Sequence, residues 1–431
     1  MDIQELYRIF QNHPNITTDS RNIAENSIFF ALKGERFDGN NYIEQALQKG
    51  AAYAVGDRKN LLPLKRIIVV DNVLHTLQLL ANYHRRKMKA KVIAITGTNG
   101  KTTTKELLAA ALSSKYNVLY TQGNQNNHIG VPLTLLRMKE ENEFAIIEMG
   151  ANHQGEIYKL CRIADPDYGL ITNVGRAHLE GFGSFEILIN SKAELYDYLR
   201  IKNGIAFCNT ENMILSSLHK NIPTIYYGTD NLSFVQGKLL ESSPFLNLEW
   251  KKDEDDMNTI RTRLIGSYNF ENALAAICIA SYFNVEDEKI NHAIAQYTPD
   301  NNRSQNKKTA RNQLIIDAYN ANPSSMKVAL DNFASLDVFP KMVILGEMNE
   351  LGIYSEQEHR KIIHSLILNK FESVVLVGKE FTKIQPLPMD WKVFERTEDM
   401  LHYLTESNIN GFSILIKGSR SNQLEKSVEC L

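Results

Sequence analysis

The chain has 431 residues, of which 43% are hydrophobic and 23% are charged. This composition is typical of a soluble globular protein, and at roughly 150 residues per domain the length predicts about three domains. The 48 Lys and Arg residues against 50 Asp and Glu residues give a formal net charge of −2. The overall charge therefore does not favour a nucleic acid or an anionic membrane surface as a partner.

Targeting and membrane signals are missing from the sequence. The opening MDIQELYRIF lacks the basic segment, the apolar run and the cleavage site of a signal peptide. No apolar run approaches the roughly 18 residues that cross a bilayer. Cys161, Cys208, Cys278 and Cys430 are scattered and show no CxxC or metal-like spacing. We expect a cytoplasmic protein with free thiols, without a membrane span and without a nucleic-acid partner.

The first 85 residues are rich in turns and contain one clear strand candidate, at 67–70. They end in a basic cluster, His84-Arg85-Arg86-Lys87. We interpret this cluster as a solvated helix end or linker in front of the next domain.

The rest of the chain repeats one pattern, a short apolar run that ends in Gly or a polar residue and leads into a helical stretch. This pattern is typical of parallel strands covered by helices. The strand candidates are 91–96, 144–148, 168–172, 314–317, 342–346, 374–378 and 414–417, and helices are predicted at 101–112, 274–282 and 355–368. A polar stretch at 297–308 separates two groups of strands. We therefore predict an α/β protein with three domains, at 1–85, 86–297 and 298–431.

A phosphate-binding loop is predicted at 97–102, GTNGKT, between a strand and a helix. Its glycines let backbone N–H groups approach phosphate oxygens, and the helix N-terminus adds positive potential. Lys101 can reach the β- and γ-phosphates, and the Thr102 hydroxyl can bind Mg²⁺. The full Walker A pattern needs a glycine five positions before Gly100, where this chain has Ile95, so the loop is a shortened variant. A glycine-rich turn with an exposed lysine is the alternative, and the strand–turn–helix context favours phosphate binding.

Further candidates follow predicted strands, where ligands bind in parallel α/β sheets. Glu148 ends one strand and can hold Mg²⁺, although an ordinary strand-end carboxylate fits its position equally well. His178 follows the next strand, but a single histidine is more often a structural hydrogen-bonding group. Lys192 stands inside a helical pattern, which favours a solvated lysine. Arg303 has the fork geometry of a phosphate clamp and can equally be an ordinary linker arginine.

The C-terminal third carries one more polar loop. Asp317 ends a predicted strand, and Asn320 and Asn322 follow it. Their amide groups can donate to and accept from a polar ligand. The alternative is a turn that starts a helix, since Pro323 and Ser324 suit the first helical positions.

Several of these stretches together resemble the Mur ligase family, the ATP-dependent amide-forming enzymes of peptidoglycan precursor synthesis. Within that family they look like the branch that adds D-alanyl-D-alanine. The stretches are TGTNGKTT at 96–103, IEMGAN at 147–152, NVGRAHLEGFG at 173–183, DAYNANP at 317–323, LGEMNELG at 345–352 and KGSR at 417–420. Near the start, DSR at 19–21, FFALKG at 29–34 and FDG at 37–39 resemble the UDP-binding domain of the family. Two positions depart from its usual pattern: Asn40 replaces His, and Glu347 replaces Asp.

The resemblance implies an activity and a division of labour. It implies a ligase that uses ATP and two Mg²⁺ ions to join D-alanyl-D-alanine to UDP-N-acetylmuramoyl-tripeptide through an acyl phosphate. Residues 1–85 would form a small UDP-binding α/β domain, and 86–297 the ATP-binding P-loop domain. Residues 298–431 would form a Rossmann-like domain for the dipeptide. We expect a monomer whose only partners are these small molecules.

The resemblance also implies residue roles. Lys101, Lys192 and His178 would be catalytic, with Lys192 carbamylated by CO₂. The metal ligands would be Thr102, Glu148, His178 and the carbamylated Lys192. The ATP-binding set would be Gly97, Thr98, Asn99, Gly100, Lys101, Thr102, Thr103, Asn269, Asn272, Arg303 and Asp317. Ser20 and Arg21 would hold the UDP end, and Asn320 and Asn322 would face the dipeptide.

Two other functions remain open at this point. A sister ligase of the family, or a folylpolyglutamate synthase, would share the ATP loop. A P-loop NTPase that drives conformational change would hydrolyse ATP without any amino-acid acceptor.

Overall fold

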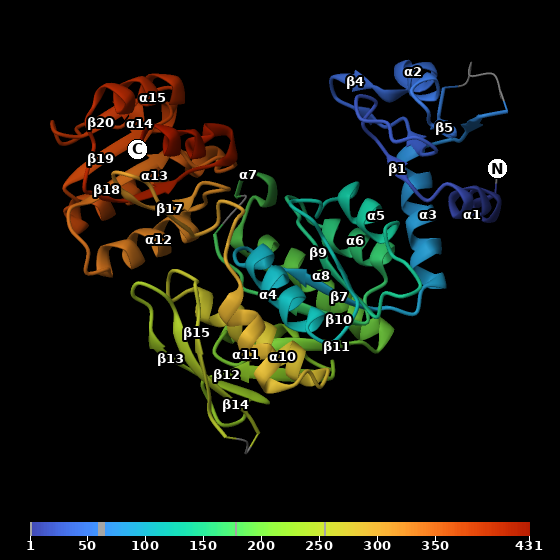
Figure 1. Cartoon of the computed structure of the whole chain (residues 1–431), viewed down its shortest axis with the longest axis horizontal. Helices are drawn as coiled ribbons and strands as arrows, with labels where there is room; N and C mark the ends of the chain where they lie inside the picture. Colours follow the sequence, from blue (N-terminus) through green and yellow to red (C-terminus); the bar gives the residue numbers. More distant parts are fainter. Residues whose placement is uncertain (1, 59–64, 177–178, 254–255) are drawn as a thin grey trace.

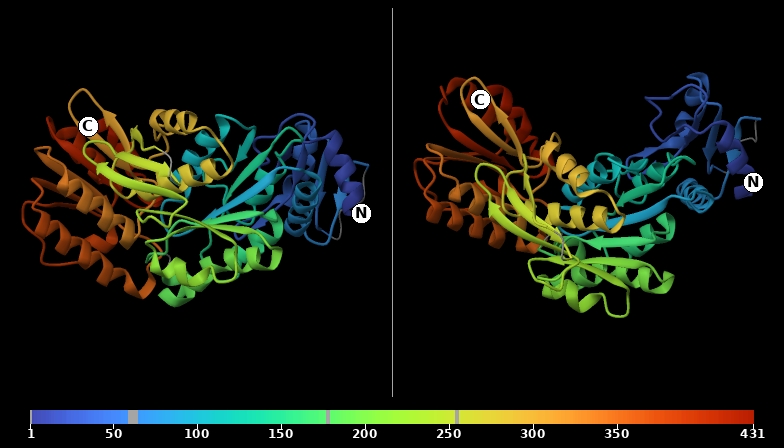
Figure 2. Two further views of the ribbon diagram at one scale, coloured as in Figure 1. Left: turned by 90° about the horizontal axis from the view of Figure 1, so that it is seen from below. Right: turned by 60° about the horizontal axis from the view of Figure 1, so that its bottom comes forward.

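The computed structural model describes residues 2–58, 65–176, 179–253 and 256–431, which form three main sheets with helices around them (Figure 1). We call the parts around these sheets the N-terminal lobe (2–90), the central lobe (91–296) and the C-terminal lobe (297–431). The N- and C-terminal lobes lie at opposite ends of the molecule with the central lobe between them, as the views in Figure 2 also show.

The N-terminal lobe has a four-stranded parallel sheet in the order β1-β2-β5-β6 and a short hairpin. Its elements are α1 (Ile3–Asn12), β1 (Ile16–Thr17), β2 (Ile28–Phe30), β3 (Lys33–Gly34), β4 (Phe37–Asp38), the 3-10 helix η1 (Gly39–Tyr42), α2 (Ile43–Gln48), β5 (Tyr53–Gly56), β6 (Ile67–Val69) and α3 (Val73–Lys87).

The central lobe has a nine-stranded sheet in the order β15-β14-β13-β12-β11-β10-β7-β9-β8. Strands β13 to β8 in this order run parallel, and β14 and β15 add an antiparallel extension. The strands are β7 (Lys91–Thr96), β8 (Val118–Tyr120), β9 (Phe144–Glu148), β10 (Tyr168–Ile171), β11 (Ile205–Asn209), β12 (Thr224–Gly228), β13 (Val235–Glu241), β14 (Asn247–Lys252) and β15 (Asn258–Arg261). The helices are α4 (Lys101–Ser113), α5 (Gly130–Leu135), α6 (Glu156–Ala164), α7 (Leu179–Phe182), α8 (Phe185–Lys202), α9 (Met213–Leu218), α10 (Asn269–Tyr282) and α11 (Asp287–Gln296).

The C-terminal lobe has a six-stranded sheet in the order β16-β17-β21-β18-β19-β20, in which only β16 is antiparallel to its neighbour. Its strands are β16 (Gln305–Lys308), β17 (Gln313–Asp317), β18 (Lys341–Gly346), β19 (Ser373–Val377), β20 (Lys392–Phe394) and β21 (Ser413–Lys417). Its helices are α12 (Pro323–Ser335), η2 (Gly352–Tyr354), α13 (Ser355–Asn369), α14 (Lys379–Thr382), α15 (Thr397–Glu406), η3 (Arg420–Asn422) and η4 (Leu424–Cys430). The predicted α/β class is confirmed, and every strand predicted from an apolar run is present within one residue at each end.

Local sequence explains why the principal elements form. Strand β7 is buried along all but its first residue, which fits a strand covered on both faces by helices. Helix α8 begins where the Ser184 hydroxyl accepts a hydrogen bond from the backbone N–H of Ile187, and it ends at Asn203 in the left-handed conformation. Helix α12 begins with Asn322 as its N-cap and Pro323 in the first turn.

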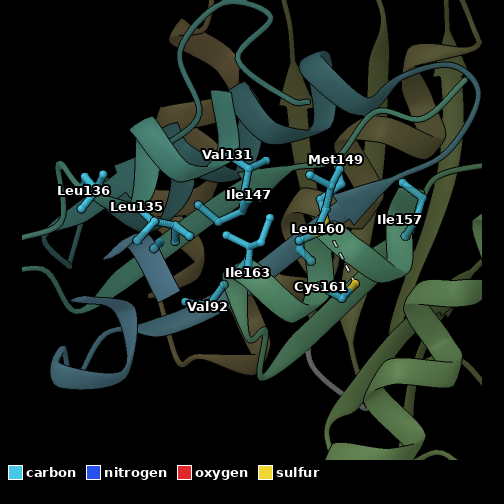
Figure 3. Packing of buried hydrophobic residues seen from close by; sticks show 14 of the residues in the cluster. Val92, Val131, Leu135, Leu136, Ile147, Met149, Ile157, Leu160, Cys161 and Ile163 are labelled. Carbon is cyan, nitrogen blue, oxygen red and sulfur yellow. Dashed lines mark hydrogen bonds between the residues drawn. The ribbon is translucent and has the colours of Figure 1, made fainter. Parts of the chain in front are cut away.

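One hydrophobic core runs from the N-terminal lobe into the central lobe without a break. It joins Leu77 and Leu80 of α3 to Val92, Ile147 and Leu160 around the central sheet. Figure 3 shows its central part, where side chains of α5, α6, β7 and β9 meet. The predicted boundary at residue 85 falls inside α3, because this helix packs on both lobes.

Polar contacts also fix α3 to the central lobe. Arg85 is buried, pairs with Asp167 at 2.8 Å and donates from Nε to the carbonyl oxygen of Ala164 at 3.2 Å. His84 is buried too, and its Nε2 lies 2.8 Å from the carbonyl oxygen of Met138. The prediction that the basic cluster is solvated is therefore wrong for these two residues, because their partners are more than 50 residues away in sequence.

The cysteines behave as expected for free thiols. Cys161, Cys208 and Cys278 are buried, Cys430 is half-buried, and none of them forms a disulfide. Burial raises the pKa of Cys208 to about 11 and raises the pKa values of the other two buried thiols further. Within the described residues, no helix is long and apolar enough to cross a membrane.

Candidate active site at the phosphate loop

A cavity of about 1430 Å³ contains most of the predicted site. Its walls come from the loop between β7 and α4, the end of β9, helices α3, α6, α8 and α10, and the C-terminal lobe. The predicted residues that line it are Thr98, Asn99, Gly100, Lys101, Thr103, Glu148, Lys192, Asn269, Asn272, Arg303, Asp317, Asn320 and Asn322.

Five predicted residues stand apart from this set. Gly97 belongs to the phosphate loop and Thr102 to the first turn of α4, but neither lines the cavity. Ser20 and Arg21 lie in the N-terminal lobe, where the largely exposed Arg21 pairs with Asp19 at 2.8 Å. His178 lies outside the described residues.

The phosphate loop needs its two glycines. Gly97 and Gly100 have φ values of 139° and 79°, a region that favours glycine. A Cβ atom at Gly97 would collide with the Thr172 hydroxyl, and one at Gly100 would collide with the Asn272 amide. The backbone N–H of Asn99 donates to Asn173 Oδ1 at 3.0 Å. Neighbouring strand ends and α10 thus hold the loop in shape.

Lys101 bends back onto the loop. Its Nζ donates to the carbonyl oxygens of Gly97 at 2.8 Å and Thr98 at 2.9 Å. Burial lowers the pKa of Lys101 to about 8, with Glu148 opposing this shift and Arg303 adding to it. A phosphate group entering the cavity would offer this ammonium a stronger acceptor than two carbonyl oxygens.

Glu148 ends β9 with its carboxylate almost fully buried. One oxygen, Oε1, accepts from Asn126 Nδ2 at 2.8 Å, and Oε2 has no hydrogen-bond partner within the described residues. Oε2 lies 3.9 Å from Nζ of the fully buried Lys105, which donates to the carbonyl oxygen of Thr121 at 2.6 Å. A buried carboxylate oxygen without a hydrogen-bond partner is suited to a hard cation.

Lys192 is buried in α8, so the interpretation from position alone, a solvated lysine, is wrong. Its side chain is 2% exposed, its Nζ donates to the carbonyl oxygen of Ala151 at 3.3 Å, and it lies 5.3 Å from the centre of the Phe182 ring. Burial, aided by the charge of Lys101, lowers the pKa of Lys192 to about 7, against the effects of Glu194 and Glu156. A neutral amine is therefore well populated at neutral pH.

Helix α10 contributes an interlocked pair of amides. Asn269 Nδ2 donates to the carbonyl oxygen of Ile265 at 2.8 Å, and Asn272 Nδ2 donates to Asn269 Oδ1 at 2.9 Å. Thr104 of α4 donates to Asn272 Oδ1 at 3.1 Å. These bonds fix α10 against the helix that follows the phosphate loop.

The C-terminal lobe adds charged groups to the same cavity. The Arg303 guanidinium lies 3.9 Å from the centre of the Tyr319 ring, and its buried Nε has no hydrogen-bond partner among the described residues. Asp317 accepts from Lys417 Nζ at 2.5 Å, and Lys417 also donates to the carbonyl oxygen of Asn320 at 3.3 Å.

One hydrogen bond joins the C-terminal lobe directly to the phosphate loop. Asn322 Nδ2 donates to Asn99 Oδ1 at 2.8 Å. The Oδ1 atom of Asn322 accepts from the backbone N–H of Ser325, which fixes the orientation of the amide. Ser324 adds a bond from its hydroxyl to the carbonyl oxygen of Arg176 at 3.2 Å. Asn322 is thus both a helix cap and a contact to the phosphate loop.

Lys105, Asn126, Tyr319 and Lys417 also belong to the site or its support, although the sequence prediction assigned them no role. Lys417 ends a buried strand, which is an available signal for a strand-end ligand. Lys105 gives a weaker signal, as a single lysine in the middle of a buried helix.

Comparisons with known proteins agree over nearly the whole chain. Three family models match, described as "Mur ligase family, catalytic domain" at 14–109, "Mur ligase middle domain" at 95–280 and "Mur ligase, glutamate ligase domain" at 302–420. A curated relative from Bacillus subtilis, named UDP-N-acetylmuramoyl-tripeptide–D-alanyl-D-alanine ligase, is 35% identical over 96% of this chain and 92% of its own.

Solved structures agree as well. MurF from Acinetobacter baumannii is 30% identical with a TM-score of 0.88, covering 99% of this chain and 97% of that one. The MurF ligase from Thermotoga maritima in complex with ADP is 27% identical with a TM-score of 0.84, covering 96% of both chains. The resemblance drawn from the motifs is confirmed, and the chain belongs to the Mur ligase family.

Proposed function

We propose that this chain joins D-alanyl-D-alanine to UDP-N-acetylmuramoyl-tripeptide at the expense of ATP, giving ADP, phosphate and UDP-N-acetylmuramoyl-pentapeptide. The observation that carries the proposal is a single cavity in which two loops are hydrogen-bonded to each other. One is the phosphate loop, and the other is the loop of the C-terminal lobe that carries Asn320 and Asn322. Near full-length similarity to a ligase of this name supports it. This activity would serve peptidoglycan precursor synthesis.

The reaction needs an activated carboxyl group. The carboxylate of the tripeptide attacks the γ-phosphorus of ATP, and ADP leaves with the bond electrons. The amine of the dipeptide then attacks the acyl phosphate, loses a proton, and the tetrahedral intermediate expels phosphate. The protein supplies positioning and positive charge rather than covalent chemistry. Lys101 and Arg303 are the cations that would neutralise the transferred phosphate.

Magnesium fits this site at Glu148, where a buried carboxylate oxygen has no hydrogen-bond partner within the described residues. Bound Mg²⁺ would neutralise charge on the ATP phosphates. Within those residues no group of three or more His, Cys, Asp or Glu side chains that could hold a metal ion is found, so the other oxygen ligands would come from ATP, water, Thr102 and a carbamate on Lys192. Thr102 and His178 stay predictions, as does a second Mg²⁺ ion.

A carbamate on Lys192 is part of the proposal. A buried amine whose pKa is about 7 has the neutral form that CO₂ requires, and a carbamate would replace a buried cation by a metal-binding anion.

We expect Lys192→Ala to be inactive and to regain partial activity with a short carboxylate such as acetate. Incubation with ¹³C-bicarbonate should give a carbamate NMR signal in wild type and in Lys202→Ala, but not in Lys192→Ala. Wild-type turnover by Lys192→Ala would refute the role.

The lobes receive separate roles in this proposal. Residues 1–85, with Ser20 and Arg21, would bind the UDP end, 86–297 would bind ATP and metal, and 298–431 would bind the dipeptide. Asn269 and Asn272 would lie near the adenine, and Asp317 would reach the nucleotide from the C-terminal lobe. Asn320 and Asn322 would face the dipeptide. A cytoplasmic location and a monomeric state stay predictions.

The decisive experiment measures phosphate release from ATP with the nucleotide-tripeptide, with and without D-alanyl-D-alanine. Release that requires both substrates, with formation of the pentapeptide product, supports the ligase. Release without any acceptor identifies a P-loop hydrolase instead. Release that requires a different amino-acid acceptor identifies a sister ligase.

A further inference from the structure

The cavity extends from the phosphate loop along one face of α3 and one face of α6. The residues of α3 that line it recur every three or four positions along the helix, some of them as adjacent pairs, and so share a face. From α3 they are Leu74, His75, Gln78, Leu79, Asn82 and Arg86, and from α6 they include Tyr158, Lys159 and Arg162. The proposed function leaves this end of the cavity without an assigned ligand group.

The two helices meet at this end. Asn82 Nδ2 donates to the carbonyl oxygens of Arg162 at 2.9 Å and Ile163 at 3.0 Å. Tyr198 of α8 joins them, with its ring centre 6.0 Å from that of Tyr158. The pKa of Tyr198 is raised by burial and by Asp165, and the charge of Arg86 acts against this rise. We call Arg86, Lys159 and Arg162 the cationic patch.

The patch is not neutralised by the protein. Within the described part of the chain, the side chains of its three members have no ion pair and no hydrogen bond. The nearby carboxylates have other partners. Asp165 accepts from Tyr198 and pairs with Lys202 at 2.9 Å, and Asp167 pairs with Arg85. Three exposed cations on the wall of a cavity favour an anionic ligand.

The distance along α6 from its start to Arg162 indicates which anionic group the cationic patch binds. Helix α6 begins beside the loop that accepts from Lys192, and Arg162 follows Glu156 by six residues. At 1.5 Å per residue, Arg162 lies about 9 Å along the helix from that end. Three extended residues span about 10 Å, so a tripeptide whose reacting carboxylate lies near the start of α6 would reach Arg162. In the substrate the sugar and the three peptide residues separate the nucleotide from the reacting carboxylate.

Resting on the proposed function, we infer that the cationic patch binds a carboxylate in the peptide part of the nucleotide-linked substrate. Two positions in the peptide can supply this group. One is a second carboxylate on the third residue, which diaminopimelate has and lysine lacks. The other is a carboxylate earlier in the peptide, which both substrates share.

The test compares Arg86→Gln/Arg162→Gln with Lys87→Gln. Lys87 is the matched control, because it is an exposed cation on α3 that does not line the cavity. We expect the double variant to raise KM and calorimetric Kd for the nucleotide-tripeptide by about tenfold or more, since charge-assisted bonds are lost. KM for ATP and for the dipeptide should stay within about twofold in both variants. The Tm should not change, since both substituted arginines are exposed.

Three ligands distinguish which group the cationic patch binds: the lysine form of the substrate, the diaminopimelate form, and UDP alone. A loss confined to the diaminopimelate form assigns the patch to the third residue, and an equal loss for both forms assigns it to the shared carboxylate. An equal loss of UDP binding would overturn the inference in favour of the diphosphate. Unchanged KM and Kd in the double variant would overturn it outright. A wild-type protein that releases no phosphate with both substrates would overturn the proposed function itself, and this inference with it.

Discussion

The half-buried Lys101 and the buried Lys192 line one cavity, and the amine of each has a lowered pKa. For Lys101 we expect the Lys101→Ala variant to lose at least about 10³-fold in phosphate release, because the charge proposed to neutralise the transferred phosphate is gone. The folded state should persist, with a Tm close to that of wild type. Lys139→Ala, at an exposed lysine outside the cavity, should keep full activity. Full activity of Lys101→Ala would contradict the role of the loop.

The lowered pKa of Lys192 predicts that the stability of the folded chain depends on pH. Its pKa is about 7 in the folded chain and 10.5 as the ordinary value, so between these values the unfolded chain binds more protons. The buried charge therefore lowers the free energy of unfolding by its full amount below pH 7, and this loss of stability disappears as pH rises towards 10.5. Lys192→Met should raise Tm at pH 6 by about 5 °C and by much less at pH 10. Thermal unfolding in bicarbonate-free buffer measures this, and an equal gain at both pH values would contradict it.

The sequence predicted the residues at strand ends but not the surroundings of Lys192. Glu148, Asp317 and the phosphate loop follow buried strands, and parallel strands bring their carboxyl ends to one edge of a sheet. The environment of Lys192 depends on Phe182 and on the loop at Ala151, which pack against α8 only in the folded chain. Helical periodicity carries no information about such contacts between polar residues far apart in sequence.

The N-cap of helix α12 also contacts the proposed active site, because Asn322 caps the helix and donates to the phosphate loop. Serine is also a good N-cap but is too short to reach Asn99. Asn322→Ser should therefore keep stability within about 0.5 kcal/mol, whereas Asn322→Ala should cost about 1 kcal/mol.

Both variants at Asn322 should lower kcat/KM by about tenfold, because both lose the bond to Asn99. Urea unfolding and steady-state kinetics separate the two effects. Unchanged kcat/KM in Asn322→Ser would mean that the bond is not part of the reacting arrangement. The turn and the helix start were predictable from Asn-Pro-Ser, but the partner in the phosphate loop was not, because 223 residues separate the two amides.

Among the described residues, no single hydrophobic core spans all three lobes. Leu77 of α3 belongs to the core that runs through the N-terminal and central lobes, and Leu366 of α13 belongs to a core of the C-terminal lobe. Leu77→Ala and Leu366→Ala should each cost about 2–5 kcal/mol, because each leaves a cavity in a packed core.

The two variants should lose stability in different lobes. Native-state hydrogen exchange should show reduced protection in β2, α3 and β7 for Leu77→Ala, and in β18 and β19 for Leu366→Ala. Equal loss of protection in all three lobes from either variant would contradict separate cores. The sequence predicted three domains from length and strand grouping, but it could not show that α3 belongs to two of them. The Arg85–Asp167 pair that anchors α3 joins residues 82 positions apart.

The distribution of thiols gives the chain a built-in labelling site. Three cysteines are sealed inside the central lobe with raised pKa values, so few of their thiolates meet a reagent. Cys430 alone is half-buried, and it stands in η4 of the C-terminal lobe. A maleimide fluorophore should therefore attach to native protein at this one position, without engineered cysteines. The fluorescence anisotropy and quenching of the attached fluorophore would then report, in real time, how the C-terminal lobe responds to each substrate.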